Sequence, residues 1–249
     1  MNIVQIATFK GPLKEKFGIP RQSGLAPALE GRIVFEPSYR DANALRGLDG
    51  FSQIWLLWGF SANRATGWSP TVRPPRLGGN TQMGVFATRS PYRPNPIGLS
   101  AARITRIELS TPEGPVIHVA GADLMDGTPI YDIKPYVTYT DAHPDASSGF
   151  VDDTPWKPLT VVIPEDIRQQ FLDSYSGAKH HDLHPKECFS CSPGVKEALL
   201  HLEALEQILA QDPRPQYQRS EKEYGLTYGP WNIRFTVTGN ILTVISASK

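Results

Sequence analysis

The stretch GVFATRSPYRPNPIGLS, residues 84–100, places two arginines and three prolines between two apolar runs and contains no acidic residue. The apolar runs predict two strands, Met83–Thr88 and Leu99–Ile107. Because proline fixes its own φ and holds the preceding residue in extended geometry, the loop between the strands is expected to be rigid. It either presents Arg89 and Arg93 to a ligand at little entropic cost or forms a stiff barrel corner.

The first 150 residues repeat this form, with short β-branched or aromatic runs separated by glycine and proline. Further strands are predicted at Ile3–Phe9, Arg32–Glu36, Ser52–Phe60, Val116–Ala122 and Ile130–Ile133. Only Asp41–Leu48 has the pattern of a short helix. Many short strands with turn signals predict an antiparallel barrel or sandwich. Strands do not alternate with long amphipathic helices, which disfavours a doubly wound nucleotide-binding fold.

The end of the chain has a different pattern. A short helix is expected to start after Pro164, with two acidic residues in its first turn. Leucines at helical spacing in Val195–Gln211 predict a longer helix with one buried stripe. Two closing strands, Trp231–Gly239 and Asn240–Ser248, meet at a Gly-Asn pair that is typical of a tight hairpin.

These patterns predict a mainly β fold in two domains. The first, at residues 1–140, is expected to be an antiparallel β-barrel. The polar sequence that follows predicts a linker at residues 141–160. A small α+β domain is expected at residues 161–249.

The composition is that of a globular protein, with 40% hydrophobic and 20% charged residues. The N-terminal sequence MNIVQIATFKGPLKEKFGIP has no basic start followed by an apolar run, so we expect no signal peptide. No segment approaches the roughly 18 to 20 apolar residues that span a bilayer. Two cysteines do not make a disulfide framework. We therefore expect a cytoplasmic protein.

The net charge of zero hides a strong segregation of charge. Phe51–Ile107 contains seven arginines and no lysine, aspartate or glutamate, whereas Glu108–Asp166 contains eleven acids and two lysines. The two segments either neutralise each other in the fold or give a basic surface for an anionic ligand. Arginine without lysine favours the second interpretation, because the planar guanidinium pairs with phosphate or carboxylate and stacks on bases.

The segment DLMDGTPIYDIKPYV, residues 123–137, brings Asp123, Asp126 and Asp132 close together in sequence. Such acids accept hydrogen bonds from ribose or amine groups, or act as bases. The D-x-[DN]-x-[DN]-G calcium pattern is absent, which disfavours a metal here.

A second metal candidate lies in HHDLHPKECFSC, residues 180–191. Its possible ligands are His180 or His181, His184, Cys188 and Cys191, a spacing that is formally compatible with tetrahedral zinc. With a single C-x-x-C in a polar lead-in to a helix, a solvated loop is the favoured interpretation, and no metal is predicted. No G-x-S-x-G motif supports a serine nucleophile.

Several long motifs resemble one known family. They are GVFATRSPYRPNPIGLS, DLMDGTPIYDIKPY, FGIPRQ, PTVRPPRLGGN and LAQDPRPQY. Together these motifs make nearly the whole chain similar to the TsaA-like or TrmO family. The resemblance implies a β-barrel methyltransferase that uses S-adenosylmethionine. It also implies methylation of N6-threonylcarbamoyladenosine at position 37 of tRNA, beside the anticodon, by a homodimer with cofactor sites near the subunit interface.

The resemblance also implies which residues contact the cofactor. They are Pro20, Arg21, Gln22, Ser61, Arg89, Leu99, Asp126, Gly127, Thr128 and Pro129. Relatives often carry a His-Gln pair where this chain has Ser61-Ala62, so a backbone contact is expected there instead of a side-chain contact. An arginine suits the cofactor carboxylate, acids suit its ribose or amine, and Leu99 suits its adenine.

The remaining arginines suit the nucleic acid. An anticodon loop offers phosphates to cations and unstacked bases to aromatic rings. Arg73, Arg76 and Arg93 are the predicted substrate contacts, with Tyr92 or Trp68 as stacking partners.

The catalytic base is left open by the sequence. Asp126, Tyr131 and Asp132 are all candidates to assist proton loss from the ureido nitrogen. Two other functions also stay open: a non-catalytic S-adenosylmethionine-sensing or RNA-binding module, and a methyltransferase for a small molecule or a protein.

Overall fold

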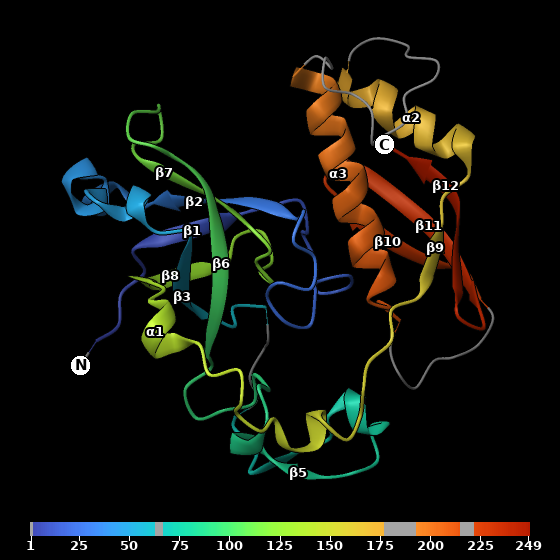
Figure 1. Ribbon diagram of the computed structural model, residues 1–249, viewed down its shortest axis with the longest axis horizontal. Helices are drawn as coiled ribbons and strands as arrows, with labels where there is room; N and C mark the ends of the chain where they lie inside the picture. The colour runs from blue at the N-terminus through green and yellow to red at the C-terminus, as the bar shows by residue number, and fades with distance from the viewer. Residues whose placement is uncertain (1, 63–66, 177–192, 215–221) are drawn as a thin grey trace.

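The computed structural model describes residues 2–62, 67–176, 193–214 and 222–249. Its first half is a closed antiparallel barrel with strand order β1-β2-β7-β6-β3-β8 (Figure 1). The barrel strands are β1 (Ala7–Lys10), β2 (Glu30–Phe35), β3 (Gln53–Gly59), β6 (Ile97–Glu108), β7 (Val116–Ala120) and β8 (Pro129–Pro135). The predicted mainly β fold with a barrel is confirmed.

The barrel core follows from alternation along the strands. In β3, Ile54, Leu56 and Trp58 are buried, whereas Trp55 and Leu57 between them are only partly covered. Branched side chains on other barrel strands, such as Ile33 on β2 and Ile117 on β7, complete the interior. Side chains of period two and β-branched shape fill such an interior well.

Two predicted elements of this half have different bounds. The strand expected at Ile3–Phe9 begins only at Ala7, because Ile3 and Val4 are more than half exposed and pair with no strand. The helix expected at Asp41–Leu48 is wrong. Two 3-10 turns, Ala42–Leu45 and Leu48–Gly50, replace it, because Gly47 between them has a φ of 84° and stops a continuous helix.

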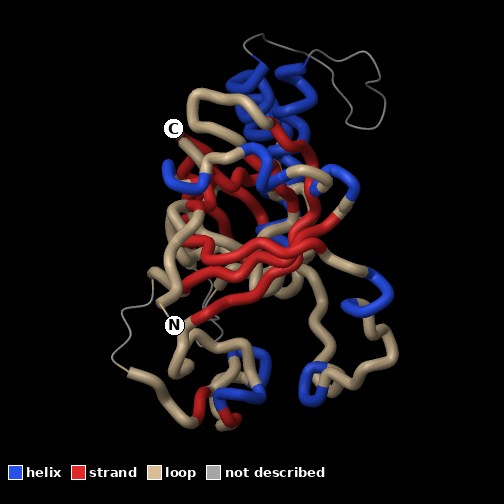
Figure 2. The backbone as a smooth tube through the Cα atoms, turned by 90° about the vertical axis from the view of Figure 1, so that its left-hand side faces the viewer, coloured by secondary structure: helices blue, strands red, loops and turns tan. Residues whose placement is uncertain are grey.

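The strand predicted at Met83–Thr88 is also wrong. Only β5 (Met83–Gly84) is a strand, and it pairs with β4 (Thr71–Val72) in a two-stranded arm. Val85–Ala87 form a 3-10 turn, with Val85 buried and its N–H bonded to the Pro70 carbonyl oxygen. The arm lies at the bottom of the view in Figure 1, and Figure 2 shows that this end of the molecule consists mainly of loops and short turns.

The second half is a four-stranded sheet covered by two helices. Strand order is β10-β11-β12-β9, with β9 parallel to β12 and the other pairs antiparallel. The elements are β9 (Thr160–Val162), α2 (Glu165–Ser176), α3 (Pro193–Ala210), β10 (Tyr224–Tyr228), β11 (Trp231–Thr238) and β12 (Ile241–Ser248). Sequence patterns predicted both helices and the hairpin, but missed β9 and β10.

The segment between the halves has little regular structure. The four-residue helix α1 (Thr138–Asp141) follows the barrel, and a 3-10 turn at Gly149–Val151 precedes β9. Further 3-10 turns lie at Pro37–Tyr39 and Pro75–Leu77. None of the described helices is both long and apolar enough to cross a bilayer.

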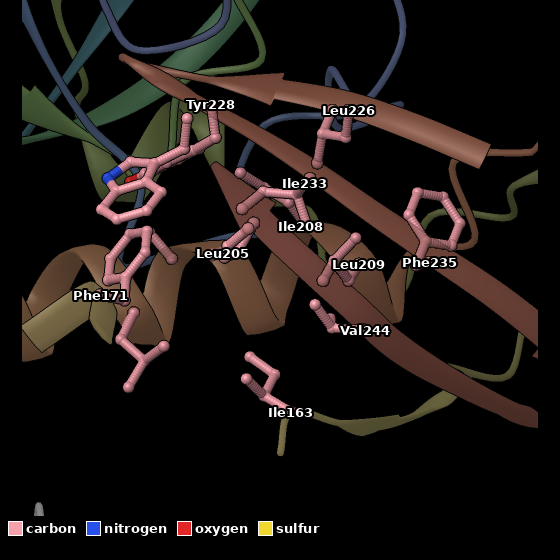
Figure 3. Close-up of a cluster of buried hydrophobic side chains, with 14 of the residues drawn as sticks. Ile163, Phe171, Leu205, Ile208, Leu209, Leu226, Tyr228, Ile233, Phe235 and Val244 are labelled. Carbon is pink, nitrogen blue, oxygen red and sulfur yellow. The ribbon is translucent and has the colours of Figure 1, made fainter. Parts of the chain in front are cut away.

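The loop between β1 and β2, residues 11–29, belongs to the core of the second half. Leu13, Ala26 and Leu29 are buried in one cluster with side chains of α2, α3 and the four-stranded sheet. Figure 3 shows part of that cluster, to which α2 contributes Phe171, α3 contributes Leu205 and β10 contributes Leu226. The loop therefore lies between the barrel and α3 (Figure 1).

Glycine allows the close approach of this loop to β10. Gly18 has a φ of 89°, and a Cβ built there would lie 2.2 Å from the Leu226 side chain. At the other end of the loop, the Gly229 N–H donates to the Pro12 carbonyl oxygen at 2.7 Å. Backbone contact on this scale fixes the loop against the second half.

Replacing Leu13 by alanine is expected to lower the free energy of unfolding by about 2–5 kcal/mol, because a fully buried leucine leaves a cavity. Leu109→Ala is the matched control: Leu109 is 55% exposed, and its truncation is expected to cost less than about 0.5 kcal/mol. Urea denaturation of the full chain measures both. Equal losses in the two variants would contradict the packing role of the loop.

Candidate active site

A pocket of about 460 Å³ opens at one end of the barrel. Four segments form it: the β1–β2 loop, the end of β3 with the residues after it, the loop from Thr88 to the start of β6, and the turn after β7. A volume of this size suits a small ligand, since such sites measure roughly 300–1,000 Å³.

The pocket gathers most of the residues that the sequence assigns to the cofactor. Those that line it are Pro20, Arg21, Gln22, Ser61, Arg89, Leu99 and Thr128. They come from four separate parts of the chain, and the closed barrel brings them to one end.

The other three predicted cofactor residues do not line the pocket. Asp126 and Gly127 belong to the turn that joins β7 to β8, and Pro129 is the first residue of β8. Asp126 Oδ1 accepts a hydrogen bond from the Gly11 N–H at 3.2 Å, and the Gly127 N–H donates to the Phe9 carbonyl oxygen at 2.9 Å. This turn therefore braces the start of the β1–β2 loop.

The two arginines of residues 84–100 have different surroundings. Arg89 Nη1 donates to Gln22 Oε1 across the pocket. Arg93 Nη1 donates to the carbonyl oxygens of Val85 and Thr88, at 3.0 and 2.7 Å, and its guanidinium lies over the Phe86 ring. Arg93 therefore stabilises its own loop, although it also borders the pocket.

Arg73 and Arg76 lie away from this pocket. Arg73 lines a second, larger groove of about 640 Å³ between the residue 70–80 loop, the β1–β2 loop and the end of α3. Arg76 Nε donates to the Thr154 carbonyl oxygen at 2.7 Å. Arg21 borders both the groove and the pocket.

The groove concentrates positive charge. Lys16, Arg21, Arg73 and Arg214 line it, and Asp212 is the acid among its described lining residues. Asp212 makes a two-pronged ion pair with Arg214, at 2.8 and 3.0 Å. Burial lowers the pKa of Arg21, with Asp212 acting in the opposite direction and Arg76 in the same direction.

A buried chain of polar side chains supports the far wall of the pocket. Trp58 Nε1 donates to Ser100 Oγ at 2.9 Å, and Ser100 Oγ donates to Asp123 Oδ1 at 2.5 Å. The Trp58 indole packs against Gly98, its partner across β3 and β6, where an added Cβ would lie 2.3 Å from the ring. A glycine at this position is therefore needed for the indole to reach Ser100.

Comparisons with known proteins identify the family of the chain. The family model of the tRNA-methyltransferase O N-terminal domain matches residues 8–142, and that of the TrmO C-terminal domain matches residues 158–249. The chain belongs to the TrmO family. The resemblance seen in the sequence motifs is confirmed.

The TrmO relatives cover both halves of the chain. A tRNA (adenine(37)-N6)-methyltransferase of Escherichia coli K12 is 38% identical over 238 residues, which is 94% of this chain and 92% of that protein. A protein of the same name from Eikenella corrodens is 42% identical over 188 residues, covering 75% and 91%. A crystal structure of TrmO from Pseudomonas aeruginosa has a TM-score of 0.75 at 31% identity and covers 100% and 98%.

The sequence of this TrmO chain places Asp123 among three acids that accept from ribose or amine groups or act as bases, but not among the three named candidates for the catalytic base. Asp123 lines the pocket, whereas the three base candidates do not. Asp132 is paired with Lys134 at 2.9 Å, Asp126 with the Gly11 amide, and the Tyr131 hydroxyl lies beside Gly59. The sequence feature that could have pointed to a buried polar partner such as Asp123 was Ser100, a polar residue at a buried position of the β6 alternation.

Of the two metal candidates in the sequence, only the acids of residues 123–137 lie in the described part of the chain. Among the described residues, no group of three or more His, Cys, Asp or Glu side chains is placed to hold a metal ion. His180, His181, His184, Cys188 and Cys191 lie outside the described residues.

The charge on Asp123 is unfavourable to the fold. Burial raises the pKa of this carboxyl, and the hydrogen bond from Ser100 and the charge of Arg89 offset only part of that rise. Because the folded state disfavours the ionised form, wild-type stability is lost as pH rises through the folded-state pKa and is fully present below the unfolded value of about 3.9.

Asp123→Asn is therefore expected to raise the free energy of unfolding at pH 7 to 8 and to lose this advantage in acid. The asparagine oxygen still accepts from Ser100, and the unfavourable buried charge is removed. Urea titrations across pH 4 to 8 measure the difference. Asp49→Asn, at an exposed position, is the control and should match wild type throughout. A variant less stable than wild type at neutral pH would contradict the expectation.

Proposed function

We propose that this chain is an S-adenosylmethionine-dependent methyltransferase that methylates N6 of threonylcarbamoyladenosine at position 37 of tRNA. The observation that carries the proposal is the single pocket in which the family's Pro20–Gln22, Arg89 and Leu99 positions converge. Both TrmO domain models match, and the Escherichia coli relative that this chain resembles over most of its length bears the name tRNA (adenine(37)-N6)-methyltransferase.

The chemistry of the pocket suits S-adenosylmethionine. Arg89 offers a guanidinium to the cofactor carboxylate, because charge-assisted forked pairs of this kind are strong and directional. Ile97, Leu99 and Phe60 offer apolar surface to the adenine. The Gln22 side chain accepts from Arg89 and donates one amide N–H to the Arg21 carbonyl oxygen, so its second N–H is the donor that it offers.

When bound, the cofactor supplies a methyl group that is activated by a positive sulfonium. The protein's part is to hold the acceptor nitrogen in line with that methyl and to keep water away, because alignment supplies much of the acceleration in such a transfer. Trp58 and Phe60, whose rings meet edge to face at 4.4 Å, form a rigid apolar wall for this purpose.

The basic groove is the proposed track for the tRNA backbone. Arg73 and Arg21 face the same hollow as Arg214 of the second half, and Arg76 lies beside it, within electrostatic range of Arg21. Phosphate contacts of this kind fix the register of a nucleic acid without reading its sequence. Trp68, 55% exposed, and Tyr92, 47% exposed, are free to stack on unpaired bases.

A homodimer in the cytoplasm completes the proposal. Phe86 and Leu99 are 71% and 55% exposed, and Leu99 lies at the pocket itself. Apolar surface of this kind beside a ligand site is what a second subunit covers. The domain limits of 1–140 and 161–249, with the linker between them, stay predictions as well.

Purified protein is expected to transfer labelled methyl groups onto threonylcarbamoylated tRNA for more than one turnover, and unmodified tRNA is expected to be a poor acceptor. Multiple turnovers exclude a non-catalytic sensing or RNA-binding module. Steep weakening of substrate binding with salt excludes a small neutral acceptor, because counterion release follows phosphate neutralisation. Equal labelling of both tRNAs, or of neither, would refute the proposed function.

Substitution of Arg89 and of Arg73 is expected to affect the binding of different ligands. Arg89→Ala should weaken cofactor binding by about 10- to 100-fold, the effect of losing a charged hydrogen bond. Arg73→Ala should leave cofactor affinity unchanged and lower the salt slope of tRNA binding by about one. Separate titrations with each ligand measure these effects, with Arg46→Ala, which lines neither the pocket nor the groove, as control. Unchanged cofactor affinity in Arg89→Ala would remove that residue from the cofactor site.

A further inference from the structure

The titratable side chains at the pocket are almost all cations. Within the described residues, Lys16, Arg21, Arg89, Arg93 and Asp123 line it, from the β1–β2 loop, the residue 88–93 loop and the turn after β7. Asp123 is thus the acid among them. A proton released in this pocket has one anionic side chain to receive it.

The carboxylate of Asp123 accepts from three donors, which are the Ser100 hydroxyl, its own backbone N–H and the backbone N–H of Ser23. Ser100 on β6 donates to Oδ1 at 2.5 Å, and Trp58 on β3 fixes the Ser100 hydroxyl by donating to its oxygen at 2.9 Å. The backbone N–H of Ser23, in the β1–β2 loop, is a further donor to the carboxylate. Ser100 is only 1% exposed, whereas Asp123 stays partly open to the pocket.

This arrangement is not explained by stability. A buried carboxylate without an ion pair is costly. Burial also makes the carboxylate a better base, since its pKa lies above the usual value for aspartate. Perturbed acids that open into a cleft are typical of functional sites.

We infer that Asp123 is the catalytic base of the methyl transfer and accepts the proton of the adenosine N6. The inference rests on the proposed function and deepens it, because the reaction needs a proton acceptor that the sequence left unassigned.

The step balances in atoms and electrons. The N6 lone pair forms the new nitrogen–carbon bond to the methyl group, and the carbon–sulfur bond breaks with its electron pair remaining on sulfur. The N6 proton passes to a carboxylate oxygen of Asp123 and is later released to water. The positive sulfonium becomes a neutral thioether, and the charge leaves as that proton.

The decisive experiment compares Asp123→Asn with wild type in single turnovers on threonylcarbamoylated tRNA at saturating cofactor. Loss of a general base is expected to lower the rate constant by about 10²- to 10⁴-fold. Cofactor affinity, measured by calorimetry without tRNA, is expected to change less than about twofold, which is the scatter of near-neutral substitutions. Asp49→Asn, at an exposed position outside the pocket, should match wild type in both measurements.

The pH dependence adds a readout that a structural role would not move. The wild-type rate is expected to rise with pH through the folded-state pKa of Asp123, and Asp123→Asn to lack this inflection. Ser100 is a positioning residue whose hydrogen bond lowers that pKa, so Ser100→Ala should move the inflection to higher pH. Should Ser100→Ala fail to fold, the profiles of wild type and Asp123→Asn decide alone.

The possible results distinguish failure of the inference from failure of the proposed function. A rate constant within about threefold of wild type in Asp123→Asn would overturn the inference, since a base contributes far more. Weakened cofactor binding with an unchanged saturated rate would also overturn it and make Asp123 a cofactor ligand. Should wild type bind the cofactor yet transfer no methyl to tRNA, the proposed function itself fails, and the inference fails with it.

Discussion

The fastening of the β1–β2 loop between the two halves is the constraint on which the site depends. On the barrel side, the Gly24 N–H donates to the Gly121 carbonyl oxygen and the Gly121 N–H donates to that of Leu29. On the other side, the Ala28 N–H donates to Gln207 Oε1 on α3 at 2.8 Å. Because the same loop carries the Pro20–Gln22 wall of the pocket, the second half holds part of the pocket in place.

The two arginines of the proline-rich stretch at residues 84–100 have different partners. Arg93 donates hydrogen bonds to two backbone carbonyl oxygens of its own segment, so its guanidinium stabilises local structure. That brace, together with the prolines, leaves the Arg89 guanidinium at the pocket, where it meets Gln22. A rigid loop loses little entropy when a ligand binds, so one arginine stabilises the loop and the other is presented to the ligand.

The local hydrophobic pattern predicted the barrel strands because the alternation of buried and less buried side chains involves only neighbouring residues. Ile54, Leu56 and Trp58 of β3 are an example. It failed at Val85, which is buried through contacts with a distant segment and turns the chain before a strand can form. The burial of Leu13 in the second half was equally invisible, since it depends on contacts with residues more than 150 positions away. The choice of Asp123 over Asp126 depended on which side of one turn faces the pocket.

Buried polar chemistry in the described barrel is concentrated at the pocket. Ser100 and Thr128 are polar residues that are nearly inaccessible to water, and both belong to this end, Thr128 in the wall and Ser100 behind Asp123. The remainder of the barrel core is aliphatic and aromatic. A buried polar network is tolerated only when each member is satisfied, and here the donors lead in one direction, from the Trp58 indole through Ser100 to a carboxylate that opens to the ligand. Because burial disfavours the charge of Asp123, folding alone does not account for a carboxylate at the end of this chain, whereas the proposed role as a base does.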